Sequence, residues 1–200
     1  MDSDGLSRPT SLTRSQVARR ERVIRAALEL AAEGGYDVVQ MRDVASRARV
    51  ALGTIYRYFP SKDALLLAVM VQWLVDLEQR VMRRPPAGDN TVARVMDVLG
   101  RALRSMDREP KLTAAVIAAM TAGDPASVAA IGDVTDTMAR IMRSAFPEDV
   151  DPASEASAAK VLGHVWWSAT IAWANGMGDI DWVAGELREA TTLIADRRFG

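Results

Sequence analysis

The chain has 200 residues, 49% of them hydrophobic, and a formal net charge of −1, which suits one domain or two small domains with a substantial core. It contains no cysteine, which excludes a disulfide framework, a thiol nucleophile and a thiolate metal site. The N-terminus lacks the apolar core of a secretory signal and the apolar run 64–75 is too short to span a bilayer, so we expect a soluble, cytoplasmic protein that does not engage a membrane.

The N-terminal region begins with a polar segment and continues into a helix. Residues 1–12 are polar, and we expect them to form a disordered arm. Thr13 and Gln16 have the spacing of a capping box, in which each side chain accepts a hydrogen bond from the other residue's backbone N–H. The pattern predicts a helix that starts there and ends at the glycine pair 34–35.

Residues 41–62 predict two short helices that cross at a tight turn. Apolar residues repeat at helical spacing on both sides of a break at Arg49 and Val50. A turn of roughly three or four residues is the separation found in a helix-turn-helix. The small side chain of Ala45 allows the first helix to approach the second.

The outward face of the second short helix carries groups suited to DNA. It has short side chains first, followed by hydroxyl groups and a guanidinium. This order suits a helix whose N-terminal end enters the major groove while its later residues contact phosphates. An ordinary helical corner, whose tyrosines only pack, is the alternative. The predicted DNA-binding residues are Arg42, Arg49, Ala51, Leu52, Gly53, Thr54, Tyr56, Arg57, Tyr58 and Lys62.

The charge distribution is consistent with a basic module on an acidic remainder. Residues 1–62 hold eleven Lys or Arg against seven Asp or Glu, a balance of +4. Residues 63–200 carry a balance of −5. A DNA-binding module joined to a domain with another task has such a contrast, although unrelated proteins also show modest charge asymmetry.

The stretch VALGTIYRYFPSKDALL resembles the signature of the TetR family of bacterial transcriptional regulators. The segment GGYDVVQMRDVA is similar to sequences of an actinobacterial branch of that family, the one that includes the mycobacterial repressor of cholesterol catabolism. The resemblance implies a helix-turn-helix DNA-binding domain over residues 13–60. It also implies a ligand-binding and dimerisation domain over residues 61–200.

Beyond the signature, start and stop signals predict six more helices. A long helix from Ser61 to about Arg84 is apolar nearly all round in its first half, so we expect it to be buried. Prolines that follow polar residues mark later helix starts. No segment alternates at period two, which predicts an all-α fold of about nine helices. The remaining helices are expected over 91–107, from Pro110, from Pro125, from Pro152 and over 179–197.

Large, adaptable apolar side chains are frequent in the second half of the chain. Methionine and tryptophan at these positions could surround an apolar ligand, as the resembled family implies, or form an ordinary core. The charged end of a ligand could lie near Arg101, Arg104 or Arg108, which could instead form a solvated face. The predicted ligand-binding residues are Trp73, Leu77, Met96, Leu103, Met106, Met120, Met138, Met142, Trp166 and Trp173.

The last two predicted helices carry an excess of apolar surface. Trp166 and Trp167 point about 100° apart on a helix, so one buried face hardly accommodates both. In the resembled family the last two helices form a homodimer. The predicted interface residues are Trp167, Val183, Leu187, Ala190 and Ile194. His164, the single histidine, is expected in the core or in this interface.

Nothing in the sequence supports a catalytic site. There is no triad partner for His164, no paired-carboxylate cluster in an apolar setting and no phosphate-binding glycine loop. We therefore predict no enzyme activity, no metal and no cofactor. The leading hypothesis is a homodimeric repressor that releases a palindromic DNA operator when a small apolar effector binds, for which the resemblance suggests a steroid-derived or long-chain acyl-CoA thioester. The alternative is an all-helical ligand-binding protein without a DNA-binding role.

Overall fold

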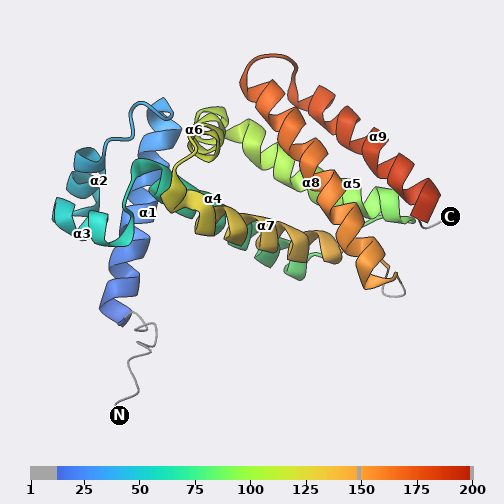
Figure 1. Cartoon of the computed structure of the whole chain (residues 1–200), viewed down its shortest axis with the longest axis horizontal. Coiled ribbons are helices and arrows are strands. Elements are labelled where there is room, and N and C mark those ends of the chain that lie inside the picture. Colours follow the sequence, from blue (N-terminus) through green and yellow to red (C-terminus); the bar gives the residue numbers. More distant parts are fainter. Residues whose placement is uncertain (1–12, 148–149, 199–200) are drawn as a thin grey trace, which may run out of the picture.

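The computed structural model describes residues 13–147 and 150–198, and this part of the chain contains helices and no strands, as predicted (Figure 1). The predicted arm, residues 1–12, lies outside the described residues. The described helices are α1 (Arg14–Gly34), α2 (Met41–Ala48), α3 (Leu52–Tyr58), α4 (Lys62–Arg83), α5 (Thr91–Arg108), α6 (Pro110–Thr121), the 3-10 turn η1 (Pro125–Ser127), α7 (Val128–Arg143), α8 (Pro152–Ala174) and α9 (Ile180–Arg198).

Local signals place the first three helices as predicted. Thr13 and Gln16 form the capping box of α1, with hydrogen bonds of 3.3 and 2.7 Å. Arg49 ends α2 in the left-handed region at φ 53°, a conformation that strains most non-glycine residues. The Ala51 side chain provides no cap for α3. The turn therefore holds its shape through packing rather than through favourable turn residues.

Two hydrophobic cores divide the molecule, and they meet within α4. The first lies under α1–α3 and includes Val44, Ile55 and Phe59, all buried. The second joins α4, α5, α7, α8 and α9. Residues 64–69 of α4 are buried, and the partly buried Met70 packs against both cores. The predicted burial of the first half of α4 is therefore confirmed, and this helix is a structural link between the two parts.

Helix α6 extends the first core beyond the predicted domain boundary at residue 61. Leu112, Ala115 and Val116 of α6 are buried together with residues of α1 and α4. The Lys111 ammonium donates a hydrogen bond of 3.0 Å to the Glu33 carbonyl oxygen at the end of α1. Helices α1–α3 thus lie at one end of the elongated molecule, and α6 and the N-terminal half of α4 support them (Figure 1).

Helix α7 begins later than predicted. Pro125 starts the short 3-10 turn η1, and the α-helix starts only at Val128. The Asp124 carboxylate accepts hydrogen bonds from the hydroxyls of Ser61 and Ser127, which ties this turn to the start of α4. Helices α8 and α9 pack side by side at the other end of the molecule (Figure 1). Among the described helices, none is long and apolar enough to cross a membrane.

Candidate DNA-binding surface and effector cavity

Helix α3 presents an exposed face of mixed hydroxyl and basic groups. Tyr56 is 50% exposed and Arg57 is exposed beside it. The Arg57 guanidinium lies 5.3 Å from the ring centroid of Tyr58, which orients both side chains. Of the ten residues predicted to bind DNA, six are exposed and four are half-buried; the exposed ones are Arg42, Arg49, Ala51, Gly53, Tyr56 and Arg57, and the half-buried ones are Leu52, Thr54, Tyr58 and Lys62.

Three of the half-buried residues also have structural contacts. Leu52 and Tyr58 pack against the first core, so only part of their surface is available to DNA. The Lys62 ammonium lies 3.5 Å from the ring centroid of Tyr36 and 3.3 Å from the Tyr36 carbonyl oxygen. Lys62 is therefore held in place at the start of α4, where its remaining donors can still contact a phosphate.

Tyr36 links this lysine to the next residue of α4. Its hydroxyl donates a 2.7 Å hydrogen bond to the Asp63 carboxylate. This hydrogen bond, with burial as a second cause, raises the pKa of Tyr36 to about 12. The neutral phenol is thus the form that the fold stabilises. Tyr36, Lys62 and Asp63 fix the junction between α1 and α4.

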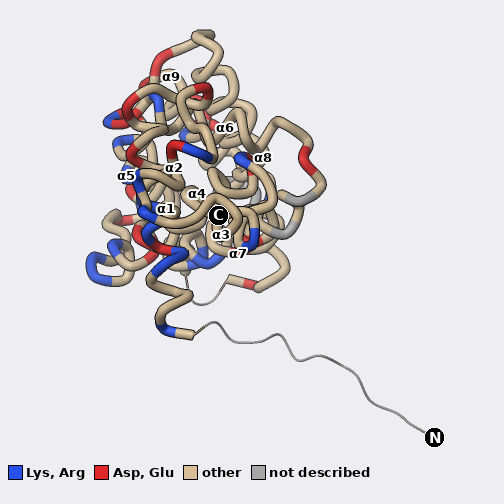
Figure 2. The backbone as a smooth tube through the Cα atoms, turned by 90° about the vertical axis from the view of Figure 1, so that its left-hand side faces the viewer, with Lys and Arg blue, Asp and Glu red and all other residues tan. Residues whose placement is uncertain are grey.

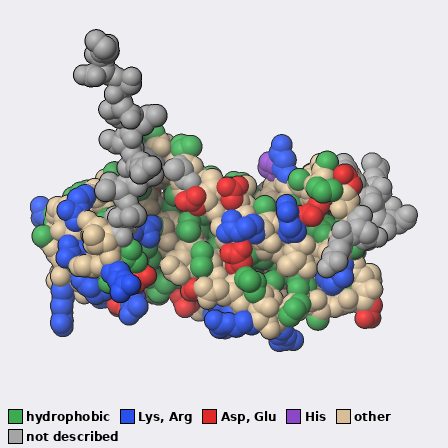
Figure 3. All heavy atoms as spheres, turned by 90° about the horizontal axis from the view of Figure 1, so that it is seen from below, with side chains coloured by type: hydrophobic (Ala, Val, Ile, Leu, Met, Phe, Trp, Pro, Cys, Tyr) green, Lys and Arg blue, Asp and Glu red, His purple; other side chains and the backbone are tan. Residues whose placement is uncertain are grey.

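A basic groove lies between α1 and the end of α2. Its lining includes Arg22, Arg25 and Arg49. Arg47 also lines the groove, but it is paired with Glu33 at 2.6 Å, a contact that lowers the pKa of that carboxyl. Lys and Arg side chains gather at this end of the molecule in the space-filling view (Figure 3), and Figure 2 marks the Lys and Arg positions along the backbone as seen from this end. Arg49 therefore belongs to a cationic surface with Arg22 and Arg25, which were not among the predicted site residues.

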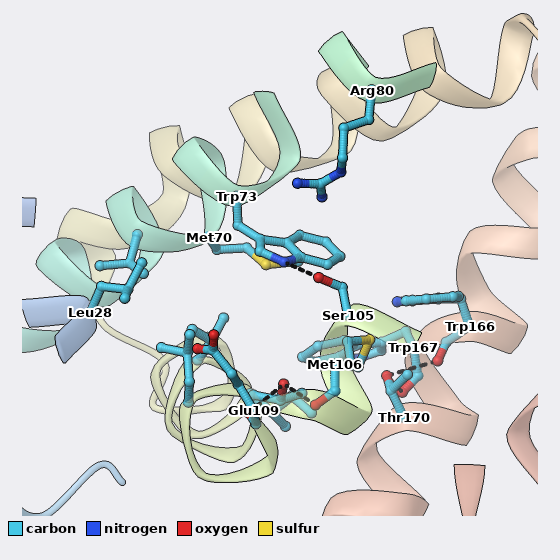
Figure 4. A pocket seen from close by; sticks show the side chains of 15 residues that line it. Leu28, Met70, Trp73, Arg80, Ser105, Met106, Glu109, Trp166, Trp167 and Thr170 are labelled. Atoms are coloured by element: carbon cyan, nitrogen blue, oxygen red, sulfur yellow. Dashed lines mark hydrogen bonds between the residues drawn. The ribbon is translucent and has the colours of Figure 1, made fainter. Parts of the chain in front are cut away.

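An apolar cavity of about 220 Å³ lies between α4, α5, α6 and α8 (Figure 4). Its walls include Met70, Leu112, Val116 and Ile117, with Leu28 of α1 at one side. The Trp73 indole N–H donates a 3.1 Å hydrogen bond to the Ser105 hydroxyl, which joins α4 to α5 across the cavity wall. The position agrees with the predicted space between α4 and α8.

Comparison with known proteins identifies the family. Two family patterns match the chain: "Bacterial regulatory proteins, tetR family" over residues 23–69, and "Tetracyclin repressor-like, C-terminal domain" over residues 88–194. The transcriptional repressor KstR of Rhodococcus jostii is 35% identical over 180 residues, which cover 90% of this chain and 84% of KstR. The chain belongs to the TetR family of transcriptional regulators.

Solved structures agree with this family membership. A TetR transcriptional regulator from Rhodococcus sp. RHA1 superposes with a TM-score of 0.82 at 34% identity, over 90% of this chain and 97% of that one. The TetR-family repressor FadR of Thermus thermophilus, in complex with lauroyl-CoA, superposes with a TM-score of 0.68 at 25% identity, over 88% and 92% of the two chains. This TetR-family chain is thus a DNA-binding regulator and not an enzyme.

The cavity of this regulator contains fewer of the predicted ligand-binding residues than expected. Trp73, Met106 and Trp166 line it. The other seven lie elsewhere, because they pack in the second core or at its edge; they are Leu77, Met96, Leu103, Met120, Met138, Met142 and Trp173. Met96, for example, is buried against Thr191 of α9. This is a correction: apolar composition alone did not distinguish the cavity wall from the core.

The arginines considered for the charged end of a ligand have other positions. Arg101 donates hydrogen bonds to the carbonyl oxygens of Arg84 and Pro85, at 2.6 and 3.2 Å, and pairs with Asp97. It therefore holds the loop between α4 and α5. Arg104 and Arg108 are exposed and do not line the cavity. The arginine that does line it is Arg80 of α4, which the sequence analysis did not consider.

The predicted dimer residues divide between the interior and the surface of the protomer. Val183 and Leu187 are completely buried, where α9 packs in the second core. Their burial corrects the prediction that they contact a partner. Trp167 is half-buried and lines the cavity, while Ala190 and Ile194 are half-buried at the edge of the core. His164 is exposed on α8, so it does not lie in the core of the protomer, and its place in a dimer interface stays a prediction.

Proposed function

We propose that this TetR-family regulator is a homodimeric repressor that releases a palindromic operator when an apolar effector enters the cavity. The observation that carries the proposal is the position of α4. Its N-terminal end follows α3 closely in the chain and shares the first core with it, and Trp73 of the same helix forms a wall of the cavity.

The surface of α3 supports major-groove binding. Gly53 and Thr54 occupy the start of the helix, where side chains meet base edges in a docked helix-turn-helix. Tyr56, Arg57 and Tyr58 follow and offer donors to phosphates. The groove with Arg22 and Arg25 adds cationic surface that could follow the DNA backbone. Because the proposed partner is chromosomal DNA, we place the protein in the cytoplasm.

Displacement of α4 would couple the cavity to DNA. Residues of α1, α4 and α6 share one core, so α4 cannot shift without changing how α1–α3 are supported. A ligand that favours the DNA-incompetent arrangement by about 1–3 kcal/mol would weaken operator binding by about 5- to 150-fold.

Relatives support an acyl compound as the effector. The similarity to the repressor bound to lauroyl-CoA favours an acyl-CoA thioester, and a steroid-derived thioester is the second candidate from the sequence resemblance. Both carry a large apolar body and a carbonyl group. At about 220 Å³ the cavity lies below the roughly 300–1,000 Å³ typical of ligand pockets, so a large effector must widen it.

A homodimer through α8 and α9 would align two recognition helices with the two halves of a palindrome. Since Val183 and Leu187 are buried inside the protomer, the proposed contact uses exposed apolar residues instead. These are Val161 on α8 together with Trp182 and Leu193 on α9.

Selection of bound sequences from random duplex DNA tests the proposal. We expect enrichment of a palindrome whose half-sites lie one or more whole helical turns apart. Affinity for the selected site should fall linearly with the logarithm of salt concentration, because phosphate contacts release counterions. A protein that enriches no sequence but still binds apolar ligands would support the alternative of a ligand-binding protein without a DNA-binding role.

A further inference from the structure

The cavity wall contains three hydroxyl groups, and their hydrogen bonds differ. Thr113 donates to the carbonyl oxygens of Met106 and Glu109, both at 3.1 Å. Thr170 donates to the carbonyl oxygens of Trp166 and Trp167. Both threonine protons are therefore engaged by the helix backbone, which leaves these side chains unable to donate to a ligand.

Ser105 is the exception. Its oxygen accepts the hydrogen bond from the Trp73 indole, and its own proton is donated to no acceptor in the described part of the chain. A serine hydroxyl can donate one hydrogen bond while it accepts another. Among the three hydroxyl groups of the wall, Ser105 is therefore the one whose proton remains available to a ligand. The ligand group that complements it is an oxygen acceptor.

Arg80 supplies positive charge to the same wall. It lies seven residues after Trp73 on α4, two helical turns along, so both side chains leave the helix on the same side. Figure 4 shows the Arg80 side chain extending from α4 on the side of the Trp73 indole. Among the described carboxylates, none forms an ion pair with Arg80.

The negative charge of the wall lies elsewhere. The carboxylate of Glu109 comes from the start of α6, on the opposite side of the cavity from Arg80 in Figure 4. A ligand carboxylate near Glu109 would be repelled, while one near Arg80 would be attracted. The two charges therefore favour one ligand orientation.

We propose that the cavity is selective for the acyl group, with the acyl oxygen bound by Ser105 and Arg80 and the apolar tail between α4, α6 and α8. This inference rests on the proposed role of the cavity as the effector site. An apolar cavity of roughly 150 Å³ takes benzene, so about 220 Å³ accommodates an acyl group of about nine non-hydrogen atoms. The acyl group could belong to a free carboxylate or to a thioester.

Titration calorimetry on the full-length protein with three ligands of equal tail length tests the selectivity. Octanoate carries charge and oxygen, octanamide carries oxygen without charge, and octanoyl-CoA carries the thioester. We expect octanoate to bind up to about fivefold more tightly than octanamide, because an exposed ion pair contributes at most about 1 kcal/mol. Tighter binding of octanoyl-CoA than of octanoate would identify the thioester as the source of the acyl group; the reverse order would identify the free acid.

Substitutions then assign the selectivity to residues. Arg80→Gln should abolish the preference for octanoate over octanamide, whereas Arg83→Gln, the same change on an exposed residue of α4 outside the cavity wall, should retain it. Ser105→Ala should lower the affinity for both octanoate and octanamide by about tenfold. Ser105→Thr, which keeps a hydroxyl, should restore part of this affinity. Equal affinity for octanoate and octanamide, or a preference that survives Arg80→Gln, would overturn the inference.

Operator binding separates this inference from the proposed function. If octanoate binds with the expected selectivity but the operator stays bound, the acyl site stands and the proposed switch fails. If another apolar compound releases the operator while none of the three acyl ligands binds, the switch stands and the acyl site fails. Circular dichroism of each variant shows whether it folds, and Arg80→Gln decides the question even if Ser105→Ala does not fold.

Discussion

Gly53 lies at the start of α3 in a position that the fold does not require to be glycine. It is exposed, and a Cβ atom added there would meet no other atom within 4 Å. Its backbone is helical, and glycine in a helix costs roughly 0.5–1 kcal/mol relative to alanine. A missing side chain that destabilises the helix and relieves no contact within the protein is best explained by close approach to a partner.

Gly53→Ala should therefore separate stability from DNA binding. We expect the free energy of unfolding to rise by about 0.5–1 kcal/mol, while affinity for the selected operator falls by about tenfold. Gly132→Ala on α7, where an added Cβ also meets nothing, is the control and should raise stability alone. Thermal unfolding and fluorescence anisotropy with labelled operator give the two quantities. Unchanged operator affinity for Gly53→Ala would contradict the proposed close approach of α3 to DNA.

Tyr36 gives a pH-dependent test of the junction between α1 and α4. The Asp63 hydrogen bond raises the pKa of Tyr36 to about 12, above its usual value near 10. The hydrogen bond therefore contributes stability below about pH 10, and this contribution is lost as the pH rises through about 12. Tyr36→Phe should be less stable than the wild type by about 1 kcal/mol at neutral pH. Denaturation at several pH values should show this difference shrinking between pH 10 and 12; a constant difference would contradict the assignment.

At the residue scale, the sequence predicted features that depend on near neighbours. The capping box of Thr13 and the helix break at Arg49 follow from local spacing. The residues of the cavity wall could not be predicted from local spacing. Arg80 and Ser105 lie on different helices, and only the tertiary fold brings them to one cavity.

Helix α4 begins with a cap that also connects to a distant segment. The Ser61 hydroxyl accepts a 3.0 Å hydrogen bond from the Ala64 N–H and donates to the Asp124 carboxylate beside η1. The first contact stabilises the helix start, and the second ties α4 to the segment that precedes α7. At this point the element that supports α1–α3 is joined to the rest of the protein.

Ser61→Ala should cost more than the loss of a helix cap alone. Asn90→Ala is the matched control, because Asn90 caps α5 through a 2.9 Å hydrogen bond from the Ala93 N–H. We expect Asn90→Ala to lower the free energy of unfolding by about 1 kcal/mol. Ser61→Ala should lower it by about 1 kcal/mol or more beyond that, because the Ser61 hydroxyl also donates to a carboxylate. Urea denaturation measures both. Equal losses would mean that the contact with Asp124 contributes nothing to stability.

At the element scale, helix boundaries were predictable where a cap or a proline marks them. Ser61, Asn90 and Asp151 each accept a backbone hydrogen bond at a helix start. Pro125 was misleading, because a proline that fits the first turn of an α-helix fits a 3-10 turn equally well. The apolar stripe of α9 was detected, but periodicity does not say whether a buried face meets the same chain or another copy.

The whole molecule carries its proposed DNA-binding surface at one end and exposed apolar residues of α8 and α9 at the other. Val161 on α8 and Leu193 on α9 are exposed in the protomer. Exposed apolar residues on two neighbouring helices can contribute to an interaction site, and the proposed dimer would cover them.

Charged substitutions on this surface should dissociate the dimer. Val161→Glu and Leu193→Glu should each give monomers by light scattering, and should weaken operator binding because one recognition helix then acts alone. Met82→Glu is the control, since Met82 is an exposed apolar residue on α4. Dimers that persist in both α8 and α9 variants would place the interface on another surface.

The most direct test of the coupling between cavity and DNA is one titration with two signals. Acyl-CoA thioesters of increasing chain length, with the matching free acids, are added to the protein bound to its labelled selected operator. Tryptophan emission reports occupancy, because Trp73 and Trp166 line the cavity, and anisotropy of the operator reports DNA release. We predict that both signals change at the same ligand concentration and that saturation lowers operator affinity by about 5- to 150-fold. Saturation of the emission change while the operator remains fully bound would contradict the account.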